Sequence, residues 1–156
     1  KHDDIGCQGR YQLFFRKKIS KLEKQIKEIL TSTKTIALVG ASSREDKDSF
    51  KVMQYLQNNG YKVIPINPFN LGKKILGENV YSSLEEVEIN IDLVDIFRPS
   101  DETPNLAHQT VKIGAKTLWL QLGIFNTEAK KIVETAKINF IENKCTKKEF
   151  EKIINK

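Results

Sequence analysis

This chain has few of the residues that build metal centres and disulfide-linked scaffolds. Its 156 residues include two cysteines, Cys7 and Cys145, and two histidines, His2 and His108. The cysteines are far apart and have no C-x-x-C spacing, which argues against a zinc site and against a disulfide-stapled secreted fold. We therefore expect no bound metal and a reducing, cytoplasmic environment.

Long hydrophobic runs are also missing. No apolar segment approaches the roughly 20 residues that span a bilayer, and none has the apolar core of a secretory signal. The hydrophobic fraction of 39% and the charged fraction of 29% are ordinary for a globular protein. The length suits one domain, and we expect no membrane partner.

Positive charge is concentrated at the beginning of the chain. The net charge is +6, and residues 1–30 contain eight of the 26 Lys and Arg but four of the 20 Asp and Glu. A role in nucleic-acid binding would rest on this segment alone. A solvated basic helix face explains the charge better, so we do not expect a nucleic-acid partner.

The sequence predicts a prefix followed by one domain. Residues 1–15 show no periodicity and are interpreted as a tail. From Ile19 the apolar residues recur at helical spacing, which predicts an amphipathic helix that packs on the domain. We place this N-terminal arm and helix at 1–30 and the domain at 31–156.

Strands and helices alternate through the domain. Predicted helices are capped by Asp48 or Ser49, by Asp101, by Asn126, and by a capping box of Thr146 and Glu149. This rhythm predicts right-handed βαβ units in an α/β fold with a parallel sheet covered on both faces. The predicted strands are 36–39, 61–66, 91–97, 116–122 and 138–141.

Ligands of such folds bind at the carboxyl ends of the strands, where the strand order reverses. This rule selects the residues that follow each predicted strand. They are Gly40–Ser43, Asn67 and Pro68, Phe97–Pro99, Gln121–Gly123, and Asn143–Cys145.

The first of these turns is the most informative. Residues 35–43 read Thr-Ile-Ala-Leu-Val-Gly-Ala-Ser-Ser, a buried strand that runs into a glycine and small hydroxyl residues. Such a turn can hold a phosphate on its N–H groups, although a purely structural turn fits Gly40 equally well. The dinucleotide motif needs three glycines, and the second strand ends without a carboxylate, so NAD is disfavoured.

Other residues at this edge also have two interpretations. Arg98 suits bidentate phosphate binding, and Lys47 is either a second phosphate partner or a solvated lysine. Asn67 is either a ligand contact or a turn residue before proline. Phe97 could pack on a base, but core packing is favoured. Asp92 and Asp95 point to opposite faces of a strand and make a poor catalytic pair.

Trp119 and Gln121 share one face of the fourth strand, where core packing of the tryptophan is favoured over ligand contact. Cys145 lies before a predicted helix with lysines nearby, which would favour its thiolate form. A half-buried structural cysteine is slightly favoured over a reactive thiol. We see no partner residues that would complete a catalytic thiol triad.

Several segments together resemble the small stand-alone CoA-binding-domain proteins, which are similar to the CoA-binding domain of the succinyl-CoA synthetase alpha subunit. The resemblance covers residues 31–150. It is carried by Val39-Gly40-Ala41-Ser42, Gly60 to Pro68, Ile75-Leu76-Gly77, Val80 to Leu84, Asp92 to Arg98, Leu118 to Gly123, and Asn143-Lys144-Cys145.

The resemblance implies a Rossmann-like three-layer αβα sandwich with a five-stranded, mostly parallel sheet. It implies CoA or an acyl-CoA as ligand, and a homo-oligomer is possible. The synthetase's phosphorylated histidine lies in a domain without a counterpart here, so ligase activity is not expected. The implied ligand residues are Gly40, Ala41, Ser42, Ser43, Lys47, Pro65, Asn67, Pro68, Phe97, Arg98, Pro99, Trp119 and Gln121.

The chain departs from the family pattern in three places. The loop 44–48 is unusually acidic, Asn143 and Lys144 stand where the family has an acidic residue and an arginine, and residues 1–30 have no counterpart. Three hypotheses remain open. The chain is a CoA-binding protein without catalysis, an enzyme of thiol or acyl chemistry at Cys145, or a regulatory module that docks through its first 30 residues.

Overall fold

The computed structural model describes residues 19–155 and divides the chain into two units, Lys1–Thr31 and Ser32–Lys156. In the described part of the first unit, helix α2 (Lys21–Ser32) begins with a capping box. The Ser20 N–H donates to Glu23 Oε1 at 3.2 Å, and the Glu23 N–H donates to Ser20 Oγ at 3.0 Å. The predicted tail at 1–15 and Cys7 lie outside the described residues, and the packing of this helix on the domain stays a prediction.

The second unit is built on a five-stranded parallel sheet, as predicted. The strand order is β2-β1-β5-β6-β7, and every neighbouring pair is parallel. A short antiparallel pair, which the sequence did not predict, lies in the connection between β2 and β5. The strands are β1 (Thr35–Val39), β2 (Lys62–Ile66), β3 (Lys74–Ile75), β4 (Glu78–Asn79), β5 (Leu93–Ile96), β6 (Thr117–Leu120) and β7 (Asn139–Ile141).

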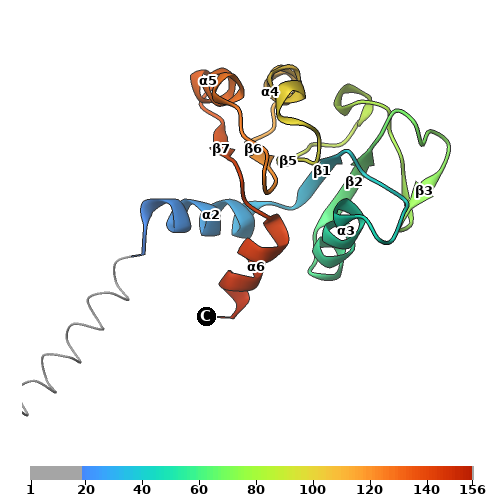
Figure 1. Ribbon diagram of the computed structural model, residues 1–156, viewed down its shortest axis with the longest axis horizontal. Coiled ribbons are helices and arrows are strands. Elements are labelled where there is room, and N and C mark those ends of the chain that lie inside the picture. Colours follow the sequence, from blue (N-terminus) through green and yellow to red (C-terminus); the bar gives the residue numbers. More distant parts are fainter. Residues whose placement is uncertain (1–18, 156) are drawn as a thin grey trace, which may run out of the picture. The chain divides into compact units, whose positions relative to one another are not determined.

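Helices cover both faces of this sheet. Helices α4 and α5 lie together on one face, and α3 and α6 lie on the other (Figure 1). The Rossmann-like three-layer αβα sandwich is therefore confirmed. The helices are α3 (Asp48–Asn58), α4 (Thr103–Lys112), α5 (Thr127–Thr135) and α6 (Thr146–Ile154), with short 3₁₀ turns η1 (Leu84–Glu86) and η2 (Ser100–Glu102).

Strand residues alternate between the two faces and sort the side chains into two layers. Val94 and Ile96 of β5 join the apolar cluster that includes Ala107 of α4 and Val133 of α5. Asp95 lies between them in sequence and points to the opposite face, together with Trp119 of the adjoining register position. The central strand thus carries a buried carboxylate on the α3 and α6 side of the sheet.

The reversal of strand order falls between β1 and β5. Strand β1 pairs with β2 on one side and with β5 on the other. The chain leaves β1 toward α3 and leaves β5 toward α4, on opposite faces of the sheet (Figure 1). Parallel sheets bind ligands where such connections diverge, so the turns after Val39 and Ile96 define the candidate site.

Three predicted helix caps are wrong and one is confirmed. Helix α3 begins at Asp48, so Asp48 and Ser49 lie inside it, and the residue before it, Lys47, makes no side-chain cap. Asp101 lies inside the 3₁₀ turn η2, and α4 begins two residues later. Helix α6 is preceded by Cys145, and the Thr146 hydroxyl donates to Asp95 Oδ2 at 3.0 Å, so it does not cap the helix. A buried hydrogen-bond partner from another element thus overrides the local capping pattern. Asn126 does cap α5, accepting from the Ala129 N–H at 2.8 Å.

Candidate ligand-binding site

Gly40 lies at the seam, the place where the turn after β1 meets the turn after β5. Its φ is +92°, and a Cβ at this position would lie 2.6 Å from the carbonyl oxygen of Phe97 and 3.1 Å from Arg98 Cδ. The turn after β1 therefore packs directly against the turn after β5. A side chain would force these turns apart, so Gly40 is required for their close approach.

Arg98 stands at this seam and is already held by a carboxylate. Its Nε and Nη2 donate to the two carboxylate oxygens of Glu102 at 2.9 and 2.8 Å. This bidentate pair lowers the pKa of Glu102 and fixes the plane of the guanidinium, although both side chains are nearly half exposed. Within residues 19–155 the guanidinium makes no other hydrogen bond, and the Nη1 group stays available to a ligand.

A larger cleft of about 470 Å³ opens on one side of Arg98. Its wall combines the turns after β5 and β6 with the first turns of α3 and α6. Three lysines and two carboxylates surround a mostly apolar floor. The lining residues are Asp48, Lys51, Val52, Phe97, Arg98, Pro99, Gln121, Leu122, Ile124, Cys145, Lys147, Lys148 and Glu151.

A smaller cleft of about 320 Å³ opens on the other side of Arg98. It is formed mainly by the turns after β1 and β2, by the segment before η1, and by α4. Arg98 belongs to both clefts, so a ligand that occupies both passes its guanidinium. The other lining residues are Val39, Gly40, Ile66, Asn67, Pro68, Phe69, Ser82, Ser83, Leu84, Glu102, Leu106 and Gln109.

Asn67 lines the smaller cleft but uses its side chain to hold the loops. Its Nδ2 donates to the Ala41 carbonyl at 2.7 Å, and its Oδ1 accepts from the Phe69 N–H at 2.8 Å. The side chain therefore ties the turn after β1 to the turn after β2. Of its two predicted roles, the geometry favours that of a turn residue. Its neighbour Phe69 is 89% exposed beside the cleft.

The turn after Gly40 presents free backbone donors. The N–H groups of Gly40 and Ala41 donate to the Ile66 carbonyl. No hydrogen bond from the N–H of Ser42 or Ser43 is recorded among residues 19–155. Helix α3 follows this turn without a side-chain cap, so the N–H groups of its first turn are available as well. Such an array favours an anion.

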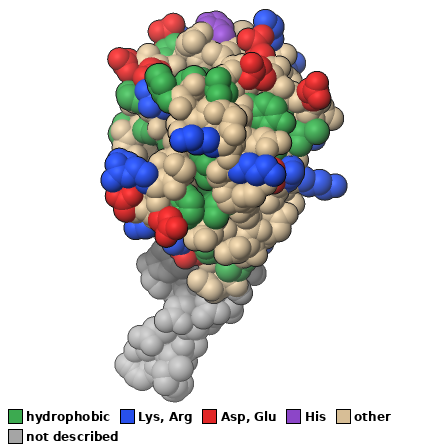
Figure 2. All heavy atoms as spheres, turned by 90° about the vertical axis from the view of Figure 1, so that its right-hand side faces the viewer, with side chains coloured by type: hydrophobic (Ala, Val, Ile, Leu, Met, Phe, Trp, Pro, Cys, Tyr) green, Lys and Arg blue, Asp and Glu red, His purple; other side chains and the backbone are tan. Residues whose placement is uncertain are grey.

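Charges of both signs alternate on the face of the molecule shown in Figure 2. The loop before α3 contains an exposed pair, with Arg44 Nη2 at 3.1 Å from Asp46 Oδ2. Such exposed pairs are weak. Lys47 precedes α3, is exposed and lines neither cleft. Lys51, one turn later on the same helix, does line the larger cleft, and helical spacing from Lys47 is the signal that could have found it.

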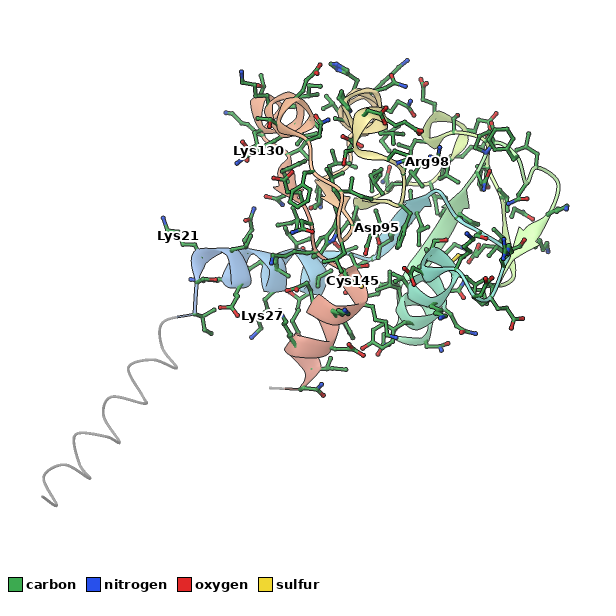
Figure 3. The ribbon with its side chains drawn as sticks, viewed as in Figure 1. Lys21, Lys27, Asp95, Arg98, Lys130 and Cys145 are labelled. Atoms are coloured by element: carbon green, nitrogen blue, oxygen red, sulfur yellow. The ribbon has the colours of Figure 1, made fainter. Side chains whose placement is uncertain are left out.

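A buried network of polar side chains lies behind the larger cleft. Gln121 Nε2 donates to Asp95 Oδ1 at 2.5 Å and to Thr146 Oγ1 at 2.8 Å. Burial raises the pKa of Asp95 to about 7, and the hydrogen bonds from Gln121 and Thr146 oppose that rise. Figure 3 shows Asp95 within the sheet, Arg98 just beyond it, and Cys145 at the start of α6. Sequence reasoning missed Asp95 and Thr146 because their partners lie on other elements.

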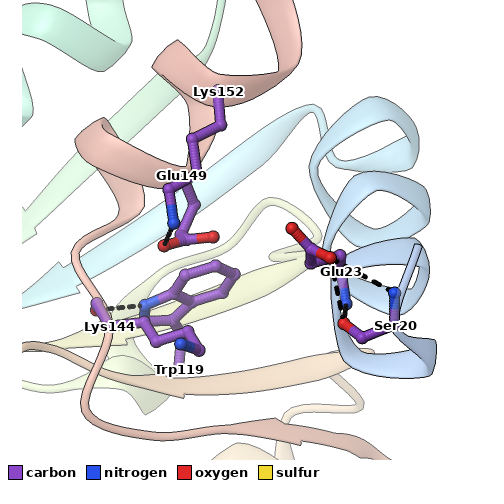
Figure 4. Close-up of polar contacts among 6 residues, drawn as sticks. All are labelled: Ser20, Glu23, Trp119, Lys144, Glu149 and Lys152. Carbon is purple, nitrogen blue, oxygen red and sulfur yellow. Dashed lines mark hydrogen bonds and ion pairs between the residues drawn. The ribbon is translucent and has the colours of Figure 1, made fainter. Parts of the chain in front are cut away.

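Trp119 is fully buried, and its indole Nε1 donates to the Lys144 carbonyl at 2.7 Å (Figure 4). It lines neither cleft, so the favoured core role fits and we leave it out of the proposed site. Ala41 and Pro65 are buried and also line neither cleft. Pro65 lies in the edge strand β2, where a missing N–H is tolerated.

Asp92 has a structural role at the other end of β5. Its Oδ2 accepts the N–H groups of Lys34 and Thr35 at 2.9 and 3.0 Å. His108 lines a separate surface depression between α4 and α5. Among residues 19–155, no group of three His, Cys, Asp or Glu side chains could hold a metal ion. In the same part of the chain, no helix has the length and apolarity to cross a membrane.

Comparison with known proteins identifies the family. The CoA binding domain family matches residues 34–151. This chain belongs to that family. The match covers all five strands of the parallel sheet and both clefts. The predicted family resemblance is therefore confirmed, and membership supports CoA as the class of ligand.

Individual relatives extend this result. The uncharacterized protein YneT of Bacillus subtilis is 37% identical over 123 residues, which are 79% of this chain and 90% of YneT. A solved structure of a hypothetical protein from Pyrococcus horikoshii superposes with a TM-score of 0.81 at 36% identity, covering 88% of this chain and 94% of that one. The ADP-forming acetate–CoA ligase of Methanocaldococcus jannaschii is 35% identical over 83 residues. These residues make up 53% of this chain but 12% of the ligase.

Proposed function

We propose that this protein binds CoA or an acyl-CoA across the two clefts, with the phosphates beside Arg98. The observation that carries the proposal is the meeting of both clefts at one guanidinium, within the segment that matches the CoA binding domain. Arginine presents paired donors that suit phosphate oxygens. The free N–H groups after Gly40 supply further donors for the same anion.

The shapes of the clefts favour one direction for the ligand. The smaller cleft has the exposed ring of Phe69 and the hydroxyl groups of Ser82 and Ser83, which suit an adenosine. The larger cleft has a volume of about 470 Å³ against about 320 Å³ for the smaller one, and has an apolar floor. It suits the pantetheine arm, with the thiol end directed toward Cys145. The volume of each cleft lies in the usual range for small-molecule sites.

No ligase step is included in this proposal. The likeness to the acetate–CoA ligase covers 12% of that enzyme, so its activity is not carried over to this chain. The side chains that line the clefts account for binding a phosphorylated ligand, and we assign no catalytic residue among them.

Thermal unfolding with CoA, dephospho-CoA and NAD in parallel tests the proposal. A ligand at about 100 times its dissociation constant stabilises by roughly 2.7 kcal/mol. For a domain of this size that raises the midpoint by about 5–10 °C. We expect the full shift with CoA, a smaller one with dephospho-CoA and none with NAD. A shift with NAD and none with CoA would overturn the proposal.

A second candidate function, thiol exchange at Cys145, is favoured by one observation. The half-buried Cys145 is a free cysteine that lines the larger cleft at the start of α6, beside Lys147 and Lys148. Its thiolate would attack one sulfur of CoA disulfide. The disulfide bond of the reagent breaks, a Cys145–CoA disulfide forms, and one CoA thiolate leaves.

Intact-mass spectrometry after incubation with CoA disulfide tests this candidate. In a Cys7→Ser background, which leaves Cys145 as the one cysteine, the expected product is one CoA adduct that a reductant removes and that Cys7→Ser/Cys145→Ser lacks. No adduct in Cys7→Ser, or an adduct that persists in the double variant, would eliminate the candidate. Because the masses report a covalent product, the result is independent of reversible CoA binding.

A further inference from the structure

Gln121 is held by two buried partners that use both of its N–H groups. Its Nε2 donates to Asp95 Oδ1 at 2.5 Å and to Thr146 Oγ1 at 2.8 Å, while the Thr146 hydroxyl donates to Asp95 Oδ2 at 3.0 Å. Asp95 and Thr146 have no exposed surface, and Gln121 is 4% exposed. The three side chains have three donor hydrogens between them, and all three are used within this triangle.

The remaining polar atom of Gln121 is the carbonyl oxygen Oε1, and Gln121 is one of the residues that line the larger cleft. Among residues 19–155, no hydrogen bond to Oε1 is recorded. In the same residues, every fully buried side-chain nitrogen or oxygen has a partner. Because Oε1 has no partner, it is not fully buried, and it is an acceptor without a donor on a residue of the cleft wall.

The direction of the amide is set by the carboxylate behind it. An ionised Asp95 only accepts hydrogen bonds, so the NH₂ group of Gln121 must face it. The opposite orientation would place Oε1 against a carboxylate and lose both donated bonds. Because burial raises the pKa of Asp95 to about 7, the carboxylate is ionised at pH 8 and the acceptor orientation holds there.

We propose that Gln121 is a specificity-determining residue of the larger cleft, where its Oε1 accepts a hydrogen bond from an N–H group of the ligand. Asp95 acts as a positioning residue, because its carboxylate fixes the orientation of the Gln121 amide. The inference rests on the proposed function, in which this cleft takes the pantetheine arm. That arm carries two secondary amides, and their N–H groups are the donors that Oε1 would select. The three lysines of the cleft only donate hydrogen bonds, so they cannot accept one from these N–H groups.

A purely structural role is the competing explanation, because the same triangle joins β5, the turn after β6 and α6. The two roles differ in what they require of Oε1. A structural role needs the N–H groups of Gln121, whereas ligand selection needs the oxygen. Comparing a variant that breaks the network but keeps the oxygen with one that removes both therefore distinguishes the two roles.

The experiment is calorimetric titration at pH 8 under reducing conditions with CoA and with adenosine 3′,5′-bisphosphate, which has no pantetheine arm. Gln121→Met removes the acceptor and both N–H donors with little change in side-chain volume. Thr146→Val is the matched control, because it breaks the triangle but leaves Gln121 Nε2 on Asp95. If Gln121→Met does not fold, the double variant Asp95→Asn/Gln121→Met is titrated in its place. The added change removes the buried charge that Gln121→Met leaves without its amide partner.

We expect Gln121→Met to weaken CoA binding roughly 5- to 50-fold, the effect of leaving one donor without its acceptor. Its affinity for the bisphosphate should stay within about twofold, and Thr146→Val should keep both affinities within about threefold. Equal losses for the two ligands, equal losses in the two variants, or no loss in Gln121→Met would overturn the inference. Failure of the natural sequence to bind either ligand would instead overturn the proposed function itself.

Discussion

The two clefts beside Arg98 are built from different kinds of structure. The smaller one is walled mainly by turns, and its amide side chain Asn67 holds those turns together through backbone groups. The larger one has helix ends in its wall and a buried network behind it, in which the Gln121 amide donates to two other side chains. Loop geometry thus shapes one cleft, and contacts between distant elements shape the other.

This difference predicts where each cleft is sensitive. Turn-based walls depend on backbone conformation, so glycine and asparagine positions control the smaller cleft. The larger cleft depends on charge and hydrogen bonding in its buried network. The following variants test this contrast, and they also test the role of Arg98 as the element that both clefts share.

The largest effect is expected from Gly40→Val, which places a side chain where the turns after β1 and β5 meet. The valine would be strained by the positive φ of position 40, and its Cβ would lie 2.6 Å from the Phe97 carbonyl oxygen. We therefore expect a loss of roughly 4–6 kcal/mol in the free energy of unfolding. Urea unfolding measures it. Gly77→Val is the control, because its φ is +84° with open space around it, and it should lose only about 1–3 kcal/mol. Equal losses would show that the close approach at the seam is unimportant.

The next largest effect is a pH dependence of stability that Asp95 causes. This residue belongs to the buried network behind the larger cleft. Its pKa is about 7 in the folded protein against 3.8 for an ordinary aspartate, because of burial. The folded state therefore holds a proton that the unfolded chain loses near pH 4. This stabilisation is complete below the unfolded pKa and is lost as the pH rises through 7, amounting to at most about 4 kcal/mol.

Urea unfolding at pH 5, 6, 7 and 8 measures this slope. Asp95→Asn should flatten it, since the amide does not titrate. Asp92→Asn makes the same chemical change where the side chain accepts backbone N–H groups, and it should keep the slope near pH 7. A wild-type slope in Asp95→Asn would assign the pH dependence to other groups.

A smaller effect, on affinity, is expected from Arg98→Gln. Loss of a charged hydrogen bond to phosphate should weaken CoA binding roughly 10- to 100-fold. Stability should change by less than about 1 kcal/mol, because the pair with Glu102 is exposed. Lys112→Gln, which removes a positive charge paired with Glu85 away from both clefts, should leave the titration unchanged. Equal weakening in the two variants would indicate a general charge effect.

The smallest effect is expected from Phe69→Ala in the smaller cleft. Its ring is 89% exposed, so stability should change by no more than about 0.5 kcal/mol. Loss of stacking on adenine should weaken adenosine 3′,5′-bisphosphate and CoA alike, by roughly 5- to 10-fold. The exposed Phe125, which lines neither cleft, is the control for loss of an aromatic side chain. A loss confined to CoA would reverse the proposed direction of the ligand.

The sequence predicted the order of strands and helices well because that information is local. Apolar runs of four or five residues mark the buried strands, and Asn126 marks the start of a helix because its side chain accepts an N–H of the first turn. The parallel sheet then follows from the alternation of strands and helices. The capping box predicted at Thr146 is wrong because a buried aspartate from another strand takes the same hydroxyl.

By itself, the sequence determined the fold class and the family, and it predicted the edge of the sheet where a ligand would bind, since each depends on neighbouring residues and their spacing. Only the tertiary structure decided which residues at that edge meet. It brings Gly40 against Phe97, directs Arg98 into both clefts, and removes Trp119 from the site. It also joins Asp95, Gln121 and Thr146, which are 25 or more residues apart in sequence. Packing of the helices on the sheet creates these contacts, and no local pattern encodes them.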